Sequence, residues 1–292
     1  MGRRWILVLA ALLALVGPGF AQAPDPSCED DGCLVESGRY RILLPANIPA
    51  SARIGAILFF HGYGGSAQDV VSDAALASVA RRLGAALVAP DGIGRSWSFP
   101  GSPASSRDEF AFVAQVLADV TARFPIDPQR IVASGFSQGG SMVWYLACRM
   151  PQRFAAFAPI AGAFWQPLPE SCALPRPPFI HVHGLADRTI PLAGRSLRQG
   201  VRQGDLFKSL AVLAPDGCTA AWENEIRRAD PPEGLACRRA RGCSSPALLE
   251  LCIHAGGHVA EAGWVERAWR IAMQPGPAIA RPTHETRAIT SP

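Results

Sequence analysis

The sequence predicts an α/β fold, in which a mostly parallel sheet is covered by helices on both faces, and three observations support this expectation. Short apolar runs alternate along the chain with segments of helical periodicity. The apolar runs, such as Ile54–Phe60, contain almost no polar residue, which is typical of strands buried on both faces. No linker-like segment interrupts residues 39–274, so we expect a single domain there.

The expected elements follow one another as strand and helix. Strands are expected at 39–44, 54–60, 85–89, 131–133, 155–160, 179–182 and 248–253. Helices are expected at 69–83, 110–120, from 138 onward, and at 192–203, 206–213 and 264–273. Ser106 and Glu109 have the spacing of a capping box, which would begin the second of these helices.

The two ends of the chain differ in composition from the middle. Arg3 and Arg4 precede an apolar run that is too short to span a bilayer, and small residues follow it, as in an export signal. We therefore expect a signal peptide at 1–21, cleaved after Ala21, and a cysteine-bearing segment at 22–38. Residues 275–292 have no apolar period and should form a loose tail. The mature protein should be secreted, to the extracellular space or the periplasm.

Charge and composition exclude several kinds of partner. The formal net charge of +4 falls to +2 once the two arginines of the signal are removed, and no long basic tract remains. Binding to nucleic acid is therefore not expected. The cysteines and histidines do not have the spacing of a zinc site, so we expect neither a metal nor a cofactor. We also expect a monomer without a membrane span.

The cysteines indicate disulfides, because all eight lie beyond the signal of an exported chain. Cys148 ends the helix that begins at Gln138, and Cys172 lies in the loop after the next strand. These two places approach each other in a doubly wound sheet, so we expect a Cys148–Cys172 bridge. Weaker expectations are Cys28–Cys33, Cys218–Cys243 and, by elimination, Cys237–Cys252.

A candidate nucleophile lies where the strand at 131–133 meets the following helix. The sequence there is Gly135-Phe-Ser137-Gln-Gly139, the pattern of a nucleophile elbow when it joins a strand to a helix. Small residues on both sides allow a sharp turn that holds the serine hydroxyl at the helix N-terminus, where an oxyanion is stabilised. The motif alone is weak, because a glycine-rich turn without chemistry has the same pattern.

A serine nucleophile needs a histidine base, and the histidine needs a carboxylate that fixes its tautomer. When the elbow lies on an α/β sheet, the chain order is serine, acid, histidine. Asp187 follows the strand at 179–182 through a short turn, at the sheet edge where ligand sites collect. Asp205 and Asp216 are weaker alternatives, because no strand leads into them.

His258 is the best candidate for the base, since it follows the strand at 248–253 and two flexible glycines. His254 is the rival, but it stands at the strand end and is better explained by packing. We interpret the histidines beside the acid strand, His181 and His183, as structural, and His284 lies in the tail.

The oxyanion of an acyl-transfer reaction needs two backbone donors. One should be the N–H of Gln138, directly after the nucleophile, and the other should come from the loop that follows the strand at 54–60. We expect Tyr63 to supply this second N–H. His61 precedes the serine in the chain, so it is better suited to holding the loop in shape.

Five motifs together resemble a known family. They are HGYGGS at 61–66, IDPQRIVASGFSQGGSMVWYLAC at 126–148, FAAFAPIAG at 154–162, HGLADRTIP at 183–191 and GGH at 256–258. The combination resembles the secreted polyhydroxybutyrate depolymerase and feruloyl esterase group of α/β-hydrolases. The resemblance implies an α/β-hydrolase catalytic domain at 39–274, a triad of Ser137, Asp187 and His258, an ester substrate and structural disulfides. One departure concerns the substrate pocket, because Val259-Ala-Glu261 stand where relatives carry an aromatic residue and a proline.

Three functions compete on this basis. The main expectation is a secreted serine esterase that acts through an acyl-enzyme, like a polyhydroxybutyrate depolymerase, on a small or polymeric ester. The alternative is a feruloyl or acetyl esterase that acts on plant polysaccharide. The third is a secreted binding protein on a hydrolase scaffold, against which the intact triad argues. The pocket of either enzyme is expected to involve Trp97, Phe99, Trp165 and Trp264.

Overall fold

Nine strands form one mixed sheet in a computed structural model that describes residues 28, 31–49, 51–245 and 248–274 of the 292-residue chain. Their spatial order is β1-β2-β4-β3-β5-β6-β7-β9-β8. The strands are β1 (Cys33–Val35), β2 (Gly38–Leu43), β3 (Ile54–Phe60), β4 (Ala86–Pro90), β5 (Ile126–Phe136), β6 (Ala156–Ile160), β7 (Phe179–Gly184), β8 (Ala236–Arg239) and β9 (Leu249–His254). In the spatial order, the six adjacent strands β4-β3-β5-β6-β7-β9 are parallel, and β1, β2 and β8 pair antiparallel at the two edges.

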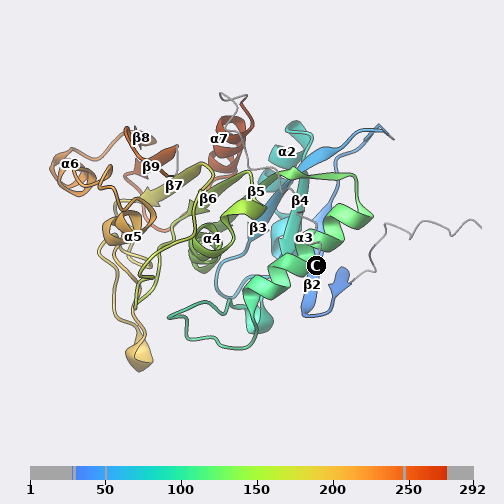
Figure 1. Ribbon diagram of the computed structural model, residues 1–292, viewed down its shortest axis with the longest axis horizontal. Helices are drawn as coiled ribbons and strands as arrows, with labels where there is room; N and C mark the ends of the chain where they lie inside the picture. Colours follow the sequence, from blue (N-terminus) through green and yellow to red (C-terminus); the bar gives the residue numbers. More distant parts are fainter. Residues whose placement is uncertain (1–27, 29–30, 50, 246–247, 275–292) are drawn as a thin grey trace, which may run out of the picture.

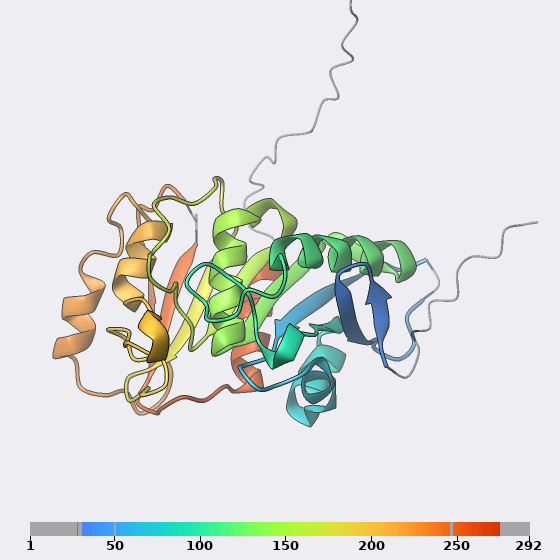
Figure 2. The same cartoon turned by 90° about the horizontal axis from the view of Figure 1, so that it is seen from below.

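Helices cover both faces of this sheet, which confirms the expected fold class (Figure 1). One face carries α1 (Ala67–Ser72), α2 (Ala74–Arg82) and α7 (Ala262–Met273). The other face carries α3 (Glu109–Arg123), α4 (Gln138–Arg149), α5 (Leu206–Leu213) and α6 (Trp222–Arg228). Seen from below, α3 and α4 lie on the opposite side of the sheet from α2 (Figure 2).

The strand β3 shows why the central strands have unbroken apolar sequences. Leu58 and Phe60 pack into the core beneath α3 and α4, whereas Ile57 and Phe59 pack into the core beneath α1, α2 and α7. All four side chains are at most 5% exposed. Because full burial of such a side chain stabilises the fold by roughly 1.5 to 3 kcal/mol, a polar residue on either face of this strand would be costly.

Two expected helices differ from the structure. The helix expected at 69–83 is divided at Asp73, whose side chain accepts hydrogen bonds from the N–H groups of Ala75 and Leu76 and so begins a second helix. The helix expected at 192–203 is replaced in this described stretch by a single 3-10 turn at Arg198–Gly200, across which Leu197 N–H donates to Val201 O at 2.7 Å. Gly194 there has a φ of +67°, which a helix does not permit. Apolar spacing alone therefore misled the prediction at 192–203.

The capping box expected at Ser106 and Glu109 is also wrong. Asp108 caps α3, because its side chain accepts from the N–H groups of Phe110 and Ala111. Glu109 is fully buried and forms an ion pair with Arg107 at 2.7 Å instead of reaching back to a capping residue. The expectation also missed β1, α6 and β8, and the pairing of β1 with β2 makes part of the cysteine-bearing segment a component of the sheet.

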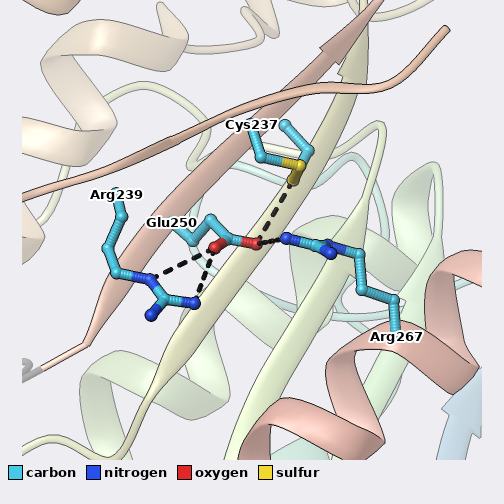
Figure 3. Close-up of a disulfide and its surroundings, with 5 residues drawn as sticks. Cys237, Arg239, Glu250 and Arg267 are labelled. Carbon is cyan, nitrogen blue, oxygen red and sulfur yellow. Dashed lines mark hydrogen bonds and ion pairs between the residues drawn. A yellow bond between two sulfur atoms is a disulfide. The ribbon is translucent and has the colours of Figure 1, made fainter.

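Four disulfides join the expected pairs: Cys28–Cys33, Cys148–Cys172, Cys218–Cys243 and Cys237–Cys252. The last one connects the edge strand β8 to β9 (Figure 3). In the described part of the chain, no helix is long and apolar enough to cross a membrane. The expected signal peptide and the tail at 275–292 lie outside the described residues.

Candidate active site

The turn between β5 and α4 holds Ser137 in a strained backbone conformation. Its φ of 60° and ψ of −120° are unfavourable for a residue with a side chain, and α4 begins at the next residue. A Cβ atom at Gly135 would lie 2.6 Å from the carbonyl oxygen of Gly139, and one at Gly139 would collide with the carbonyls of Phe60 and His61. The two glycines are therefore required by the close approach of backbone, as the elbow motif predicts.

Ser137, His258 and Asp187 are joined by two short hydrogen bonds. His258 Nε2 lies 2.8 Å from Ser137 Oγ, and His258 Nδ1 lies 2.7 Å from Asp187 Oδ2. Because a carboxylate only accepts, Nδ1 carries the proton and Nε2 is free to accept the serine proton. The three residues come from the ends of β5, β7 and β9, which lie at the same edge of the sheet.

Both carboxylate oxygens of Asp187 accept hydrogen bonds. Oδ1 accepts the N–H groups of Thr189 and Ile190, each at 2.8 Å, while Oδ2 faces His258. The Asp187 side chain is fully buried, and burial alone would raise the pKa of its carboxyl. The hydrogen bonds from His258 and Ile190, together with the nearby His183, outweigh burial and lower the pKa of Asp187 below its usual value. Asp187 is therefore ionised at neutral pH.

The rival candidates have other contacts. Asp205 caps α5 by accepting the N–H of Lys208, and Asp216 accepts the N–H of Ser244. His254 packs against Trp264, with the ring centroids 4.8 Å apart, and accepts the N–H of Gly256. The structure therefore places none of these three in the hydrogen-bonded chain that ends at the serine.

The loop after β3 is braced as a candidate oxyanion hole. His61 Nδ1 donates to Gly62 O at 2.8 Å, His61 Nε2 accepts the N–H of Gly92 at 3.0 Å, and Trp97 Nε1 donates to His61 O at 2.8 Å. Burial lowers the pKa of His61, which agrees with a neutral ring in this role.

The two expected oxyanion donors both belong to backbone near the serine. The Tyr63 N–H has no acceptor among the described residues. Gln138 is the first residue of α4, where the N–H groups have no acceptor within the helix. A Cβ atom placed on Gly62 would lie 3.5 Å from the Cβ of Ser137, so this loop is adjacent to the nucleophile. The Gln138 side chain forms hydrogen bonds with Ser96 Oγ, so the expected role of Gln138 in the oxyanion hole concerns its backbone N–H alone.

The four aromatic residues expected to line the pocket are at most 8% exposed, and their place in the pocket stays a prediction. Their exposed fractions are 0% for Trp97, 5% for Phe99, 4% for Trp165 and 8% for Trp264. The Trp165 indole donates to Ser141 Oγ at 3.1 Å, and the Phe99 ring stacks on Tyr145.

Three exposed apolar side chains belong to segments that carry the site or bond to it. Tyr63 is 76% exposed, and Ile93 and Val259 are each 45% exposed. Tyr63 follows the glycine that approaches Ser137, and Val259 follows His258 directly. Ile93 belongs to the turn that bonds to the oxyanion loop through Gly64 N–H and Arg95 O at 2.8 Å. The sequence signal for Val259 was its place in the departure after the catalytic histidine. Tyr63 was expected only as a backbone donor, and Ile93 had no signal.

Comparison with known proteins shows which family and which proteins the chain is similar to. Residues 55–190 match the family described as alpha/beta hydrolase fold. The chain is 29% identical over 220 residues to a protein of Nocardia uniformis subsp. tsuyamanensis named "Putative esterase NocK", covering 69% of this chain and 64% of that protein. It is 27% identical over 242 residues to feruloyl esterase B of Piromyces equi, covering 76% of this chain and 43% of that one. The chain thus spans less than two thirds of the length of these two relatives.

A solved structure supports the same fold. An acetyl xylan esterase from Aspergillus awamori superposes with a TM-score of 0.52 at 15% identity, over 80% of this chain and 94% of that chain. At this identity the likeness concerns the fold alone.

Proposed function

Because this chain belongs to the alpha/beta hydrolases, we propose that it is a serine carboxylesterase that acts through Ser137, His258 and Asp187. One observation carries the proposal: two hydrogen bonds, of 2.8 and 2.7 Å, join the serine hydroxyl to a buried carboxylate through a single imidazole. The strained elbow presents this hydroxyl at the start of a helix. A binding protein on the same scaffold would not need the three side chains in this arrangement.

The proposed reaction proceeds in two halves. Ser137 Oγ attacks the ester carbonyl while His258 Nε2 takes its proton, and Asp187 stabilises the imidazolium that forms. The N–H groups of Gln138 and Tyr63 would bind the oxyanion of the tetrahedral intermediate. His258 then gives the proton to the leaving alcohol, which leaves an acyl-serine. Water repeats the sequence, so that the carboxylic acid is released and Ser137 is restored.

We further propose hydroxycinnamoyl esters, of which feruloyl esters are the example, as the substrate class. Relatives named as feruloyl esterases support this choice over the polyhydroxybutyrate depolymerase reading that the sequence motifs favoured. The exposed ring of Tyr63, next to the oxyanion loop, offers an aromatic surface to a planar acyl group. Hydroxybutyrate oligomers are the second candidate, because Ile93 and Val259 add aliphatic surface at the same edge.

The location of the protein is part of the proposal. Four disulfides among the described residues are typical of a protein that matures in an oxidising compartment. We therefore propose that the protein acts outside the cytosol, which agrees with the export signal expected at 1–21.

A hydrolysis panel tests the proposal. Methyl ferulate, hydroxybutyrate oligomers and short-chain nitrophenyl esters are compared at equal concentration, with Ser137→Ala as the inactive variant. Ser209→Ala is the control, since Ser209 is a buried serine on α5 outside the site. Highest kcat/KM on methyl ferulate, abolished only by Ser137→Ala, is the expected result. Preference for the oligomers would reject the feruloyl assignment, and no hydrolysis of any ester would reject the esterase.

A further inference from the structure

A second histidine lies behind the acid of the triad and has no part in the proton transfers proposed above. His183 is on β7, four residues before Asp187, and its side chain is fully buried. Burial of an ionisable ring costs free energy unless its polar atoms are paired. Each of its ring nitrogens does have a partner, so its contacts define what the ring does there.

His183 and Asp187 hold the same residue from two sides. His183 Nε2–H donates to the carbonyl oxygen of Ile190 at 2.8 Å, while the N–H of Ile190 donates to Asp187 Oδ1 at 2.8 Å. His183 Nε2 also lies 3.5 Å from Asp187 Oδ2, the oxygen that faces His258. The imidazole therefore closes the turn from 187 to 190 and fixes the direction of the carboxylate.

The His183 ring must be neutral to donate from Nε2 and accept at Nδ1 at the same time, and its surroundings keep it neutral. With the proton on Nε2, His183 Nδ1 accepts from His181 Nε2–H at 2.9 Å, and His181 in turn packs against Trp144 of α4. Burial lowers the pKa of His183 to about 4, helped by His258 and His254, whereas the Ile190 carbonyl and Asp187 act in the opposite direction. Burial and His183 lower the pKa of His181 as well.

Neutrality at this position has a consequence for the base. A charged His183 would compete with His258 for the negative charge of Asp187, since both rings approach the same oxygen. A neutral ring positions the carboxylate but leaves its charge to stabilise the imidazolium that forms on His258 during turnover.

We propose that His183 is a positioning residue, whose buried Nε2–H closes the 187–190 turn so that Asp187 presents Oδ2 to His258. The inference rests on the proposed function, because it assigns Asp187 as the acid of the triad. It predicts that the hydrogen bond donated by position 183 matters for turnover, and not only the volume of the ring.

Two substitutions separate the hydrogen bond from the volume. His183→Gln places an amide N–H close to the position of Nε2–H, whereas His183→Leu fills similar space without a donor. Ser209→Ala is the matched control, because Ser209 is also a buried residue and the substitution removes one side-chain bond, from Ser209 Oγ to Asp205 O at 2.7 Å, on α5. Each variant is assayed for kcat, KM and the pH dependence of kcat/KM. The far-downfield proton resonance of the His258–Asp187 hydrogen bond is recorded in parallel.

The expected result is a loss of about 10- to 100-fold in kcat for His183→Leu with little change in KM, the scale of a displaced catalytic group. The acid limb of its pH profile should move and the downfield resonance should weaken. His183→Gln should restore most of kcat and the resonance, and Ser209→Ala should change neither.

Two results would overturn the inference. A folded His183→Leu enzyme with wild-type kcat and an unchanged resonance would show that the turn needs no donor at 183. Equal losses in the Leu and Gln variants would show that only packing matters. The resonance does not depend on a substrate, so the positioning role is tested even if wild-type protein hydrolyses none of the esters and the proposed function fails.

Discussion

Two buried carboxylates on neighbouring strands, Asp187 after β7 and Glu250 within β9, have partners of different chemical character. Their exposed fractions are 5% and 2%, so burial does not distinguish them. Asp187 accepts a hydrogen bond from an imidazole, and Glu250 accepts from two guanidinium groups.

The Glu250 cluster is built from permanent charges (Figure 3). Arg239 of β8 lies 3.1 Å from one carboxylate oxygen, and Arg267 of α7 lies 2.7 Å from the other. Guanidinium does not lose its proton in proteins, so no proton can move within this cluster. Together with the adjacent Cys237–Cys252 bridge, it ties an edge strand and the last helix to the sheet.

The Asp187 pair contains an imidazole, which can carry a proton on one or on both of its nitrogens. His258 links this carboxylate to Ser137, so a charge that appears on the ring is stabilised at the moment of reaction. The partner of a buried carboxylate, more than its burial, therefore decides whether the carboxylate can take part in catalysis. Substitutions that remove only the charge at each position test this difference.

The largest effect is expected from neutralising the two carboxylates separately. Asp187→Asn should lower kcat by about 10⁴-fold and leave the fold intact, because the amide no longer fixes the histidine tautomer. Glu250→Gln should keep kcat but lower the free energy of unfolding by about 1 to 3 kcal/mol, since two guanidinium groups lose their counter-charge. Steady-state kinetics and urea unfolding of both variants measure this. Comparable loss of kcat in both variants would remove the distinction.

The next effect concerns the pH dependence of stability. The native pKa of His183, about 4, lies below its unfolded value, so the unfolded chain binds the extra proton first as pH falls. The contribution of neutral His183 to the free energy of unfolding is fully present above the ordinary histidine pKa. It is lost as the pH falls toward the native pKa, by up to roughly 3 kcal/mol. Asp187, whose pKa is also lowered, contributes in the same direction but only below the ordinary carboxyl pKa.

Unfolding in urea at pH 7 and pH 5 separates the histidines from Asp187. Burial also lowers the pKa of His61, His181 and His254, so a variant at position 183 is needed to identify the share of His183. We expect wild-type protein to lose stability between these two values and His183→Gln to lose less. An equal loss in the variant would mean that His183 is not the group that resists protonation.

The disulfide beside Glu250 should support stability without affecting chemistry. Cys237 and Cys252 are 15 residues apart, and closing a loop of this size is worth about 3 kcal/mol in the chain-entropy model. Combined Cys237→Ser and Cys252→Ala substitutions should lower the urea midpoint and leave kcat at 25 °C unchanged. Reduced kcat in a variant that is still folded would show that this edge of the sheet acts on the triad.

The smallest effect is expected from one arm of the Glu250 cluster. The Arg239 side chain is 55% exposed, so its ion pair is largely screened by solvent. Arg239→Ala should lower the free energy of unfolding by no more than about 1 kcal/mol. Thermal unfolding of this variant beside Arg267→Ala, whose side chain is 40% exposed, ranks the two arms. A larger loss from Arg239→Ala would mean that the edge strand depends on this pair.

The parts of the molecule that the sequence predicted well depend on local signals. The apolar run of β3 needs no distant partner to identify it as a buried strand, and the glycines around Ser137 report a turn that only small residues permit. Asp187 and His258 each follow a strand, which placed them at the same sheet edge before any distance was known.

The parts that the sequence predicted poorly depend on direction and on distant contacts. Trp97 and Trp165 are buried, and their indole N–H groups donate to His61 O and Ser141 Oγ, which are distant in the chain. In the sequence, Glu250 has the pattern of an ordinary strand residue. Its partner Arg239 lies 11 residues before it, and its partner Arg267 lies 17 residues after it. Hydrophobic periodicity contains no information on such pairings, so the Glu250 cluster could be identified only from the structure.

Covalent labelling by a fluorophosphonate tests whether Ser137 is activated by His258 and Asp187, since only an activated serine reacts quickly with this probe. Peptide mass spectrometry of labelled wild-type protein should show one adduct, on the peptide that contains Ser137. Glu250→Gln should label at nearly the wild-type rate and Asp187→Asn far more slowly. An adduct at another residue, or equal slowing in both variants, would contradict the account.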